Sequence, residues 1–251
     1  MAKAKFDKYL ARNASIREIH LPGPGPKAVR QAIVMPALAE RQHLPEALES
    51  LRRNPTAAKE YTLVVVVVNN PAPANLPANE HESFRTIKNE NEATLAWLAD
   101  TRGFADDLHV AWIDAAGDGR ELPPPGGVGQ ARKIGADSVL AALADPDTGP
   151  APAGELNTVR VVHLDADTVV EPTYLPVVQS MPLDGRTGGA LLPFAHQQAA
   201  TAREQTALEC YELYMRYLTE GLAFAESPYA YHALGSAMLS TAEAYVKAGG
   251  M

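Results

Sequence analysis

One uninterrupted apolar segment of the chain, residues 63–68, contains five consecutive valines. β-Branched side chains without polar alternation are typical of a strand that is covered on both faces, so we expect a central parallel strand over residues 61–68. Shorter apolar segments, bounded by proline, glycine or polar residues, predict the other strands. These lie at residues 29–35, 108–113, 159–164, 189–194 and 231–240.

Between these segments, apolar residues recur at steps of three and four. In residues 43–53 they are Leu44, Ala47, Leu48 and Leu51. Similar patterning predicts helices over residues 6–16, 81–99, 131–143, 201–224 and 242–247. Strands that alternate with helices favour right-handed crossovers between parallel strands. The expected fold class is therefore α/β, with a Rossmann-like, mostly parallel sheet flanked by helices.

The helix predicted over residues 201–224 carries an apolar stripe made of Leu208, Tyr211, Met215, Leu218 and Leu222. Such a stripe normally faces a core. Cys210 lies beside it, and nothing in the sequence indicates an activated thiol, so we expect it to pack in the core or at its boundary. It is the only cysteine, which excludes an intramolecular disulfide and a cysteine-based zinc cluster.

The N-terminal segment differs from the rest of the chain in charge. The whole protein has a net charge of −8, which argues against wholesale nucleic-acid binding. Residues 1–30 nevertheless hold seven lysines and arginines against two acidic residues. This segment is expected either to form a solvated terminal helix or to contact anionic lipid or an acidic partner. The prolines and glycines of residues 21–26 end it, so we divide the chain into residues 1–27 and 28–251.

The sequence contains no apolar run of the roughly 18 residues that a membrane span requires. Its charged N-terminus also lacks the apolar centre of a secretory signal. We therefore expect a cytoplasmic protein with no transmembrane segment.

Several candidate binding residues follow predicted strands. In an open parallel sheet, ligands bind beyond the carboxyl ends of the strands. Residues 36–40 follow the first strand, Asn69 and Asn70 follow the second, and Asp165 and Asp167 follow the fourth. Two carboxylates on one turn repel each other unless a cation such as Mg²⁺ or Mn²⁺ neutralises them. The alternative is a solvated turn or a helix cap.

The loop before residue 132 is rich in glycine, but it does not match a dinucleotide-binding motif. Residues 123–125 are prolines rather than a strand, and Arg132 stands where the last glycine of that motif would be. What remains is a helix start at which Arg132 and Lys133 either meet an anion or are ordinary surface cations. His232 is expected either to be structural or to complete a metal site. The common hydrolase and nucleoside-triphosphatase motifs are absent from the sequence.

Taken in order, these segments resemble the family 2 glycosyltransferases of the GT-A fold. Residues 32–51 are similar to that family's opening strand, loop and helix, and residues 127–137 to its "G…AR N…G" helix start. Residues 163–168 resemble its D-x-D segment, and residues 235–251 its acceptor-side strand and helix. The resemblance implies a nucleotide-sugar-binding GT-A domain over residues 28–251. It further implies sugar transfer from a UDP- or GDP-linked donor to a hydroxyl acceptor.

By the same resemblance, Pro36, Ala37 and Glu40 would flank the donor nucleotide. Asn69 would lie near its base, and Arg132 would approach the base or a phosphate. The sequence departs from the family pattern at two places here. Ala39 stands where asparagine is usual, and Asn69 and Asn70 stand where aspartates are common.

The resemblance also implies a bound Mn²⁺ or Mg²⁺ ion. Asp165 would hold the ribose or a metal-bound water, Asp167 would ligate the metal, and His232 would be a third ligand. Inverting members usually take their general base from an acidic motif soon after the last matched segment, whereas this chain stops at Met251. We expect that part of the acceptor region lies outside it. A base from elsewhere and a retaining reaction are the alternatives.

Two other functions remain open. A sugar-nucleotidyltransferase also binds nucleotide and metal on an α/β sheet, but it usually has a glycine-rich basic loop after the first strand, and residues 36–40 do not form one. A non-catalytic nucleotide-sugar-binding domain would need no general base.

Overall fold

The computed structural model describes residues 2–12, 15–73, 81–100, 107–124, 126–145, 156–183, 187–232 and 236–250. Within these residues, six strands form one sheet in the order β3-β2-β1-β4-β6-β5. Their bounds are β1 (Gln31–Ala37), β2 (Thr62–Asn69), β3 (His109–Ala115), β4 (Arg160–His163), β5 (Gly189–Leu191) and β6 (Met238–Thr241). β1 pairs in parallel with β2 and β4, and β2 with β3, whereas β6 is antiparallel to β4 and β5. The predicted α/β class with a mostly parallel sheet is confirmed.

The valine-rich strand β2 lies between β1 and β3, and each of its residues is buried. Val64, Val66 and Val68 belong to one core cluster, while Val65 and Val67 belong to the other. Because successive side chains of a strand point to opposite faces, an all-apolar strand is expected where both faces are covered. This explains why β2 shows no polar alternation.

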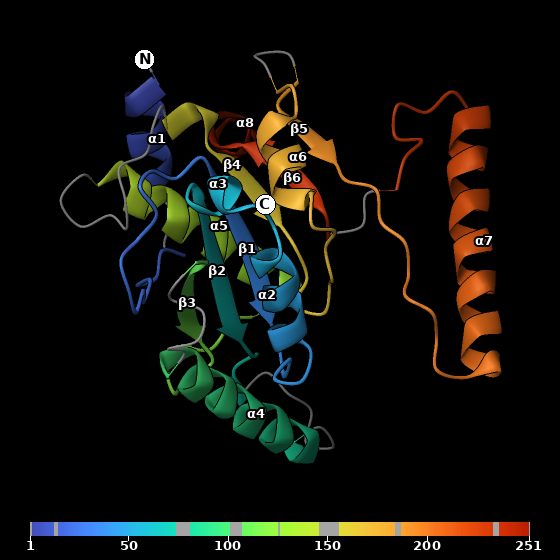
Figure 1. The fold of residues 1–251 in the computed structure, drawn as a ribbon, viewed down its shortest axis with the longest axis horizontal. Coiled ribbons are helices and arrows are strands. Elements are labelled where there is room, and N and C mark those ends of the chain that lie inside the picture. The colour runs from blue at the N-terminus through green and yellow to red at the C-terminus, as the bar shows by residue number, and fades with distance from the viewer. Residues whose placement is uncertain are drawn as a thin grey trace.

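Helices cover both faces of the sheet (Figure 1). On one face are α2 (Leu44–Arg52), α3 (Thr56–Lys59) and α6 (Tyr174–Ser180), and α4 (His81–Ala99) packs against β2 and β3. On the other face are α1 (Ala2–Leu10), α5 (Val128–Ala144) and α8 (Ala242–Ala248), and a 3₁₀ turn, η3 (Leu156–Thr158), precedes β4. None of the helices in the described residues is long and apolar enough to cross a membrane.

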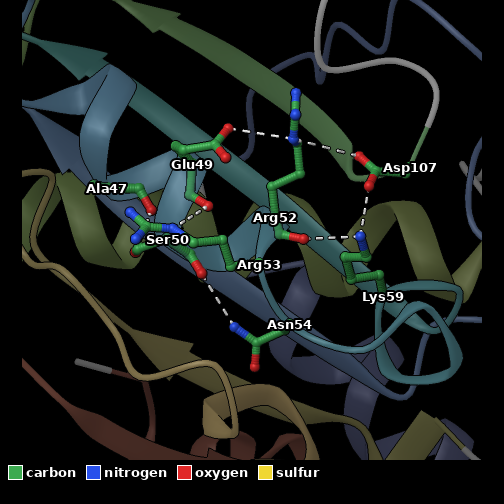
Figure 2. Close-up of polar contacts among 8 residues, drawn as sticks. All are labelled: Ala47, Glu49, Ser50, Arg52, Arg53, Asn54, Lys59 and Asp107. Carbon is green, nitrogen blue, oxygen red and sulfur yellow. Dashed lines mark hydrogen bonds and ion pairs between the residues drawn. The ribbon is translucent and has the colours of Figure 1, made fainter.

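A buried lysine, Lys59, joins α2 and α3 to the segment that precedes β3. The ammonium of Lys59 pairs with Asp107 at 2.6 Å and donates a hydrogen bond to the carbonyl of Arg52 at 2.8 Å (Figure 2). The side chain of Lys59 is almost wholly buried, so both contacts compensate for the water that it loses on folding.

The N-terminal helix α1 begins and ends earlier than the sequence predicts, at Ala2 and Leu10 rather than at residues 6 and 16. Phe6 is only 2% exposed and packs in the core cluster that α5 and α8 also form. Tyr9 and Leu10 pack partly against the same cluster, so the apolar side of a helix that carries four charged residues is docked. The basic segment therefore includes a packed helix.

The longest helix, α7 (Ala202–Phe224), stands apart from the sheet (Figure 1). Its start follows from a capping box in which Thr201 and Glu204 bond reciprocally to each other's backbone N–H groups. None of its residues is buried, and Cys210 is exposed. The predicted core packing of the stripe and of Cys210 is therefore wrong, because apolar periodicity specifies a helix without specifying what covers it.

Candidate functional site

A cleft of about 510 Å³ opens at the carboxyl ends of β1, β2 and β4. Most of the predicted site residues line it, namely Pro36, Glu40, Asn69, Arg132, Asp165 and Asp167. The sheet explains this gathering, because β1 pairs in parallel with both β2 and β4 and their carboxyl ends therefore lie side by side. The loop before α5 closes another side, where Gly126 and Gly127 have φ angles of 65° and 135° that favour glycine.

A short polar contact in the cleft joins α5 to the turn after β4. The Arg132 guanidinium donates from Nη2 to Asp165 Oδ1 at 2.5 Å. Arg132 is 8% exposed and Asp165 is 36% exposed, so the pair is only partly withdrawn from water. Arg132 Nε is buried and has no hydrogen-bond partner within the described residues, which leaves one donor of the guanidinium unused.

The turn after β4 directs its two carboxylates into the cleft. Asp165 and Asp167 both line it, while Ala166 between them also belongs to a core cluster. The backbone N–H of Thr168 donates to the carbonyl of Asp165 at 3.1 Å, which closes the turn. Asp167 is exposed. Its carboxylate can therefore reach a ligand without displacing protein packing.

The segment after this turn is anchored to α2. Ser50 Oγ accepts a hydrogen bond from the backbone N–H of Val170 at 3.0 Å, and Asn54 Oδ1 accepts one from the N–H of Leu175 at 2.8 Å. Ser50 itself donates to the carbonyl of Ala47, and Asn54 to that of Ser50 (Figure 2). Both side chains are buried. These bonds fix the path of the chain as it leaves the acidic turn.

A second anchor, Asn91 on α4, holds the ends of β1 and β2. Its Oδ1 accepts a hydrogen bond from the backbone N–H of Ala39 at 2.9 Å, and its Nδ2 donates to the carbonyl of Asn69 at 3.0 Å and to Asn70 Oδ1 at 3.1 Å. Ala39 has a φ of 57°, a left-handed conformation that is uncommon for alanine. Asn69 Oδ1 is buried without a hydrogen-bond partner in the described part of the chain.

Sequence reasoning missed Asn91, Ser50 and Asn54. A signal existed for Asn91, because it shares a helix face with the apolar residues Phe84, Leu95 and Leu98. A polar side chain in such a stripe indicates a buried hydrogen-bond partner, although the pattern does not say which one.

Two predicted site residues do not line the cleft. The side chain of Ala37 is fully buried in a core cluster, as alternation along β1 requires when Pro36 faces the cleft. The ring of His232 lies beside the hydroxyl of Thr219 on α7, with N···O distances of 3.2 and 2.9 Å. In the part of the chain that the structure describes, no three His, Cys, Asp or Glu side chains gather closely enough to hold a metal ion.

The donor atoms of the cleft nevertheless suit Mg²⁺ or Mn²⁺. Both ions prefer oxygen ligands, and Mg²⁺ is commonly bound by one or two carboxylates together with water and substrate phosphates. Asp167 and Asp165 supply such carboxylates at the edge of the cleft. A third protein ligand is not required where water and ligand phosphates complete the coordination.

His163 lies on β4, just before the acidic turn. Burial, together with the positive charge of Arg132, lowers the pKa of His163 to about 4. The imidazole is therefore neutral near pH 7, as expected of a structural histidine that is almost wholly buried.

No protein-family model and no curated protein matches the sequence. Among solved structures, the chain is similar to residues 1–349 of TarS from S. aureus, with 15% identity and a TM-score of 0.31 over 59% of this chain and 30% of that chain. A second TarS structure, with UDP-GlcNAc, gives 14% identity and a TM-score of 0.32 over 59% and 29%. The mannosyltransferase PcManGT from Pyrobaculum calidifontis was solved with GDP-Man and Mn²⁺. It is 15% identical to this chain, with a TM-score of 0.40 over 99% of this chain and 53% of that chain.

This chain thus spans about half or less of the length of each of these solved chains. A likeness of this size does not establish an activity. The residues of the cleft must therefore carry any functional conclusion.

Proposed function

We propose that the cleft binds a nucleotide-sugar and that this chain is the donor-binding part of a metal-dependent glycosyltransferase, of the family 2 type that its motifs resemble. The observation that carries the proposal is the meeting of Arg132, Asp165 and Asp167 at the carboxyl ends of parallel strands. Opposite charges at the rim of one cleft suit a ligand that is itself anionic and binds together with a cation.

In this proposal the diphosphate lies between Asp167 and the first turn of α5. Asp167 holds Mg²⁺ or Mn²⁺, which when bound stabilises the negative charge that develops on the departing nucleoside diphosphate. Free backbone N–H groups at the start of α5, together with Arg132, attract the phosphates from the other side. The glycines before α5 allow its backbone to approach the ligand closely.

The nucleoside lies toward β1 and β2 in the same proposal. Asn69 Oδ1, which has no partner among the described residues, accepts a hydrogen bond from the base. The second carboxylate oxygen of Asp165 accepts a hydrogen bond from a ribose hydroxyl, while Asp165 Oδ1 keeps its contact with Arg132. Pro36 and Glu40 form the adjacent wall, and Glu40 pairs with His43 at 2.8 Å.

Several finer statements about the reaction stay predictions, namely the choice of UDP or GDP, the hydroxyl acceptor and the general base. The division of the chain into residues 1–27 and 28–251, the further acceptor region and a cytoplasmic location also stay predictions. The same holds for a metal-ligand role of His232, whose ring lies beside Thr219 on α7 and does not line the cleft.

Calorimetric titration of UDP and GDP, each with and without Mn²⁺, tests the proposal. We expect metal-dependent binding that falls by about tenfold or more in Asp167→Asn, since loss of a charge-assisted contact commonly costs that much. The control Glu220→Gln removes one negative charge from an exposed position on α7 and should bind as the wild type does. Equal binding by the wild type and Asp167→Asn would refute the assigned role. Donor binding by a longer chain without sugar transfer would instead identify a binding module.

A further inference from the structure

A second pocket, of about 590 Å³, lies between α1, α5 and α8. The phenol of Tyr9 lines it, but most of the lining side chains are cationic. These are Lys5, Lys8, Arg12, Lys133 and Lys247. This concentration of positive charge stands out in a protein whose net charge is −8. A pocket of this size has room for a small anionic group, and it is open to solvent on one side.

Only part of this charge is neutralised by nearby carboxylates. Lys133 pairs with Asp137 at 3.0 Å, and Lys247 pairs with Glu243 at 2.8 Å. The other three cations, Lys5, Lys8 and Arg12, are exposed and form no close ion pair within the described residues, although Lys5 lies near enough to Glu243 to help Lys247 lower the pKa of that carboxyl. The pocket therefore keeps an excess of positive charge that an anionic ligand would compensate.

The floor of the pocket is held by buried hydrogen bonds. Asp137 is fully buried, and its Oδ1 accepts from Tyr9 at 2.7 Å and from Tyr245 at 3.0 Å. Lys133 donates to the Tyr9 hydroxyl at 2.9 Å and also contacts Asp137 Oδ2. These contacts tie α1, α5 and α8 together. They use two of the three N–H groups of the Lys133 ammonium, and within the described part of the chain the third is left for a ligand.

This pocket is separate from the donor cleft. Arg132 and Lys133 are neighbours on α5, yet Arg132 lines the cleft and Lys133 lines the pocket, and no lining residue is common to both. An anion in the pocket would therefore not be the donor diphosphate. Its binding can be measured independently of the proposed transferase function.

We propose that the pocket binds a ligand that carries phosphate groups. Phosphate offers several acceptor oxygens and more than one negative charge, which matches a set of three unpaired cations around a fixed ammonium. The guanidinium of Arg12 can form two parallel hydrogen bonds to one phosphate. The phosphate can belong to a soluble molecule or to the headgroup of a lipid. The recognition chemistry is the same in both cases.

Titration of pyrophosphate in the presence of EDTA tests this proposal, because removal of divalent metal weakens binding at the donor cleft. The test variant is Lys5→Gln/Lys8→Gln/Arg12→Gln, in which all three altered residues are exposed. The matched control, Arg53→Gln/Arg85→Gln/Arg203→Gln, removes three exposed charges elsewhere. We expect the wild type to bind, the control to stay within about twofold of it, and the test variant to bind about tenfold more weakly or worse.

Two further experiments show whether pyrophosphate binds in the pocket or in the cleft, and whether the natural ligand is a lipid headgroup or a soluble molecule. Arg132→Gln should retain pyrophosphate binding in EDTA, because it alters the cleft and not the pocket. Cosedimentation with phosphatidylcholine vesicles, with and without phosphatidylglycerol, then separates the sources. Binding that needs phosphatidylglycerol and is lost in the test variant identifies a lipid headgroup, whereas pyrophosphate binding without vesicle binding identifies a soluble ligand.

Three results would overturn the proposal. The first is that the wild type binds neither pyrophosphate nor phosphatidylglycerol vesicles. The second is an equal loss of binding in the test and control variants, which would reflect net charge alone. The third is a loss confined to Arg132→Gln, which would assign the binding to the donor cleft.

Discussion

Arg132 and Asp165 meet across the cleft, although 33 positions separate them in the sequence. The contact joins the first turns of α5 to the end of β4, so it fixes two walls of the cleft relative to each other. Because Arg132 is nearly buried, removal of Asp165 would leave a cation with little water around it. The pair therefore contributes to the shape of the cleft before any ligand binds.

A double-mutant cycle measures this coupling. We expect Arg132→Gln and Asp165→Asn each to lower the free energy of unfolding by about 1–2 kcal/mol, a range reduced from that of fully buried pairs because Asp165 is partly exposed. The double variant should lose less than the sum of the two, since neither charge is then left unpaired. Urea unfolding provides the measurement. Strictly additive losses would show that the two side chains do not interact in solution.

The left-handed conformation of Ala39 predicts a stabilising substitution. Ala39→Gly removes the contact between Cβ and the backbone that disfavours a positive φ, and should raise the free energy of unfolding by about 1 kcal/mol. The control Ala57→Gly, at an exposed position on α3, should lower it by about 0.5–1 kcal/mol. Thermal and urea unfolding of both variants give the comparison. A loss of stability in Ala39→Gly would mean that the turn adopts another conformation.

The hydrogen bonds of Asn91 predict a large effect at a residue outside the cleft. Asn91→Leu breaks its contacts with Ala39, Asn69 and Asn70, and should cost about 2–3 kcal/mol of unfolding free energy. It should also weaken nucleotide binding, because the ends of β1 and β2 lose their common support. Asn89→Leu, at an exposed position on the same helix, is the control and should change both quantities little. Similar results for the two variants would contradict the role of Asn91.

Close packing of α5 on the sheet predicts opposite effects for two helical glycines. A Cβ atom at Gly135 would overlap the side chains of Val34 and Val67, so Gly135→Ala should lower the free energy of unfolding by about 1–3 kcal/mol. A Cβ atom at Gly221 on α7 would meet nothing within 4 Å, so Gly221→Ala should raise it by up to about 1 kcal/mol. Chemical denaturation of both variants tests the prediction. Stabilisation by Gly135→Ala would show that α5 lies farther from the sheet.

The fold could be predicted because local patterns determined most of its elements. The valines of β2 required burial on both faces, and the order of strands and helices required a mostly parallel sheet. General sheet geometry then placed Asn69, Asp165 and Asp167 at one edge before any contact was known. The same logic did not distinguish Ala37 from Pro36, since their side chains point to opposite faces of β1.

The anchors of the cleft could not be predicted, because they depend on tertiary pairing. Ser50 meets Val170 and Asn54 meets Leu175, in each case across more than a hundred positions. No local pattern specifies such partners. The same reason explains the error for α7, where the apolar stripe predicted a helix correctly but implied a covering surface that the described residues do not provide.

The hydrogen bonds of Asp137 bear on how this protein is made. Tyr9 emerges from the ribosome well before Asp137, but Tyr245 emerges about a hundred residues after it. When a nascent chain has formed α5, the carboxylate of Asp137 therefore still lacks the hydrogen bond that the Tyr245 hydroxyl later donates to it. The helical layer formed by α1, α5 and α8 can therefore reach its final state only after Tyr245 has left the ribosome, which favours late consolidation of this side of the sheet over a sequential build-up from the N-terminus.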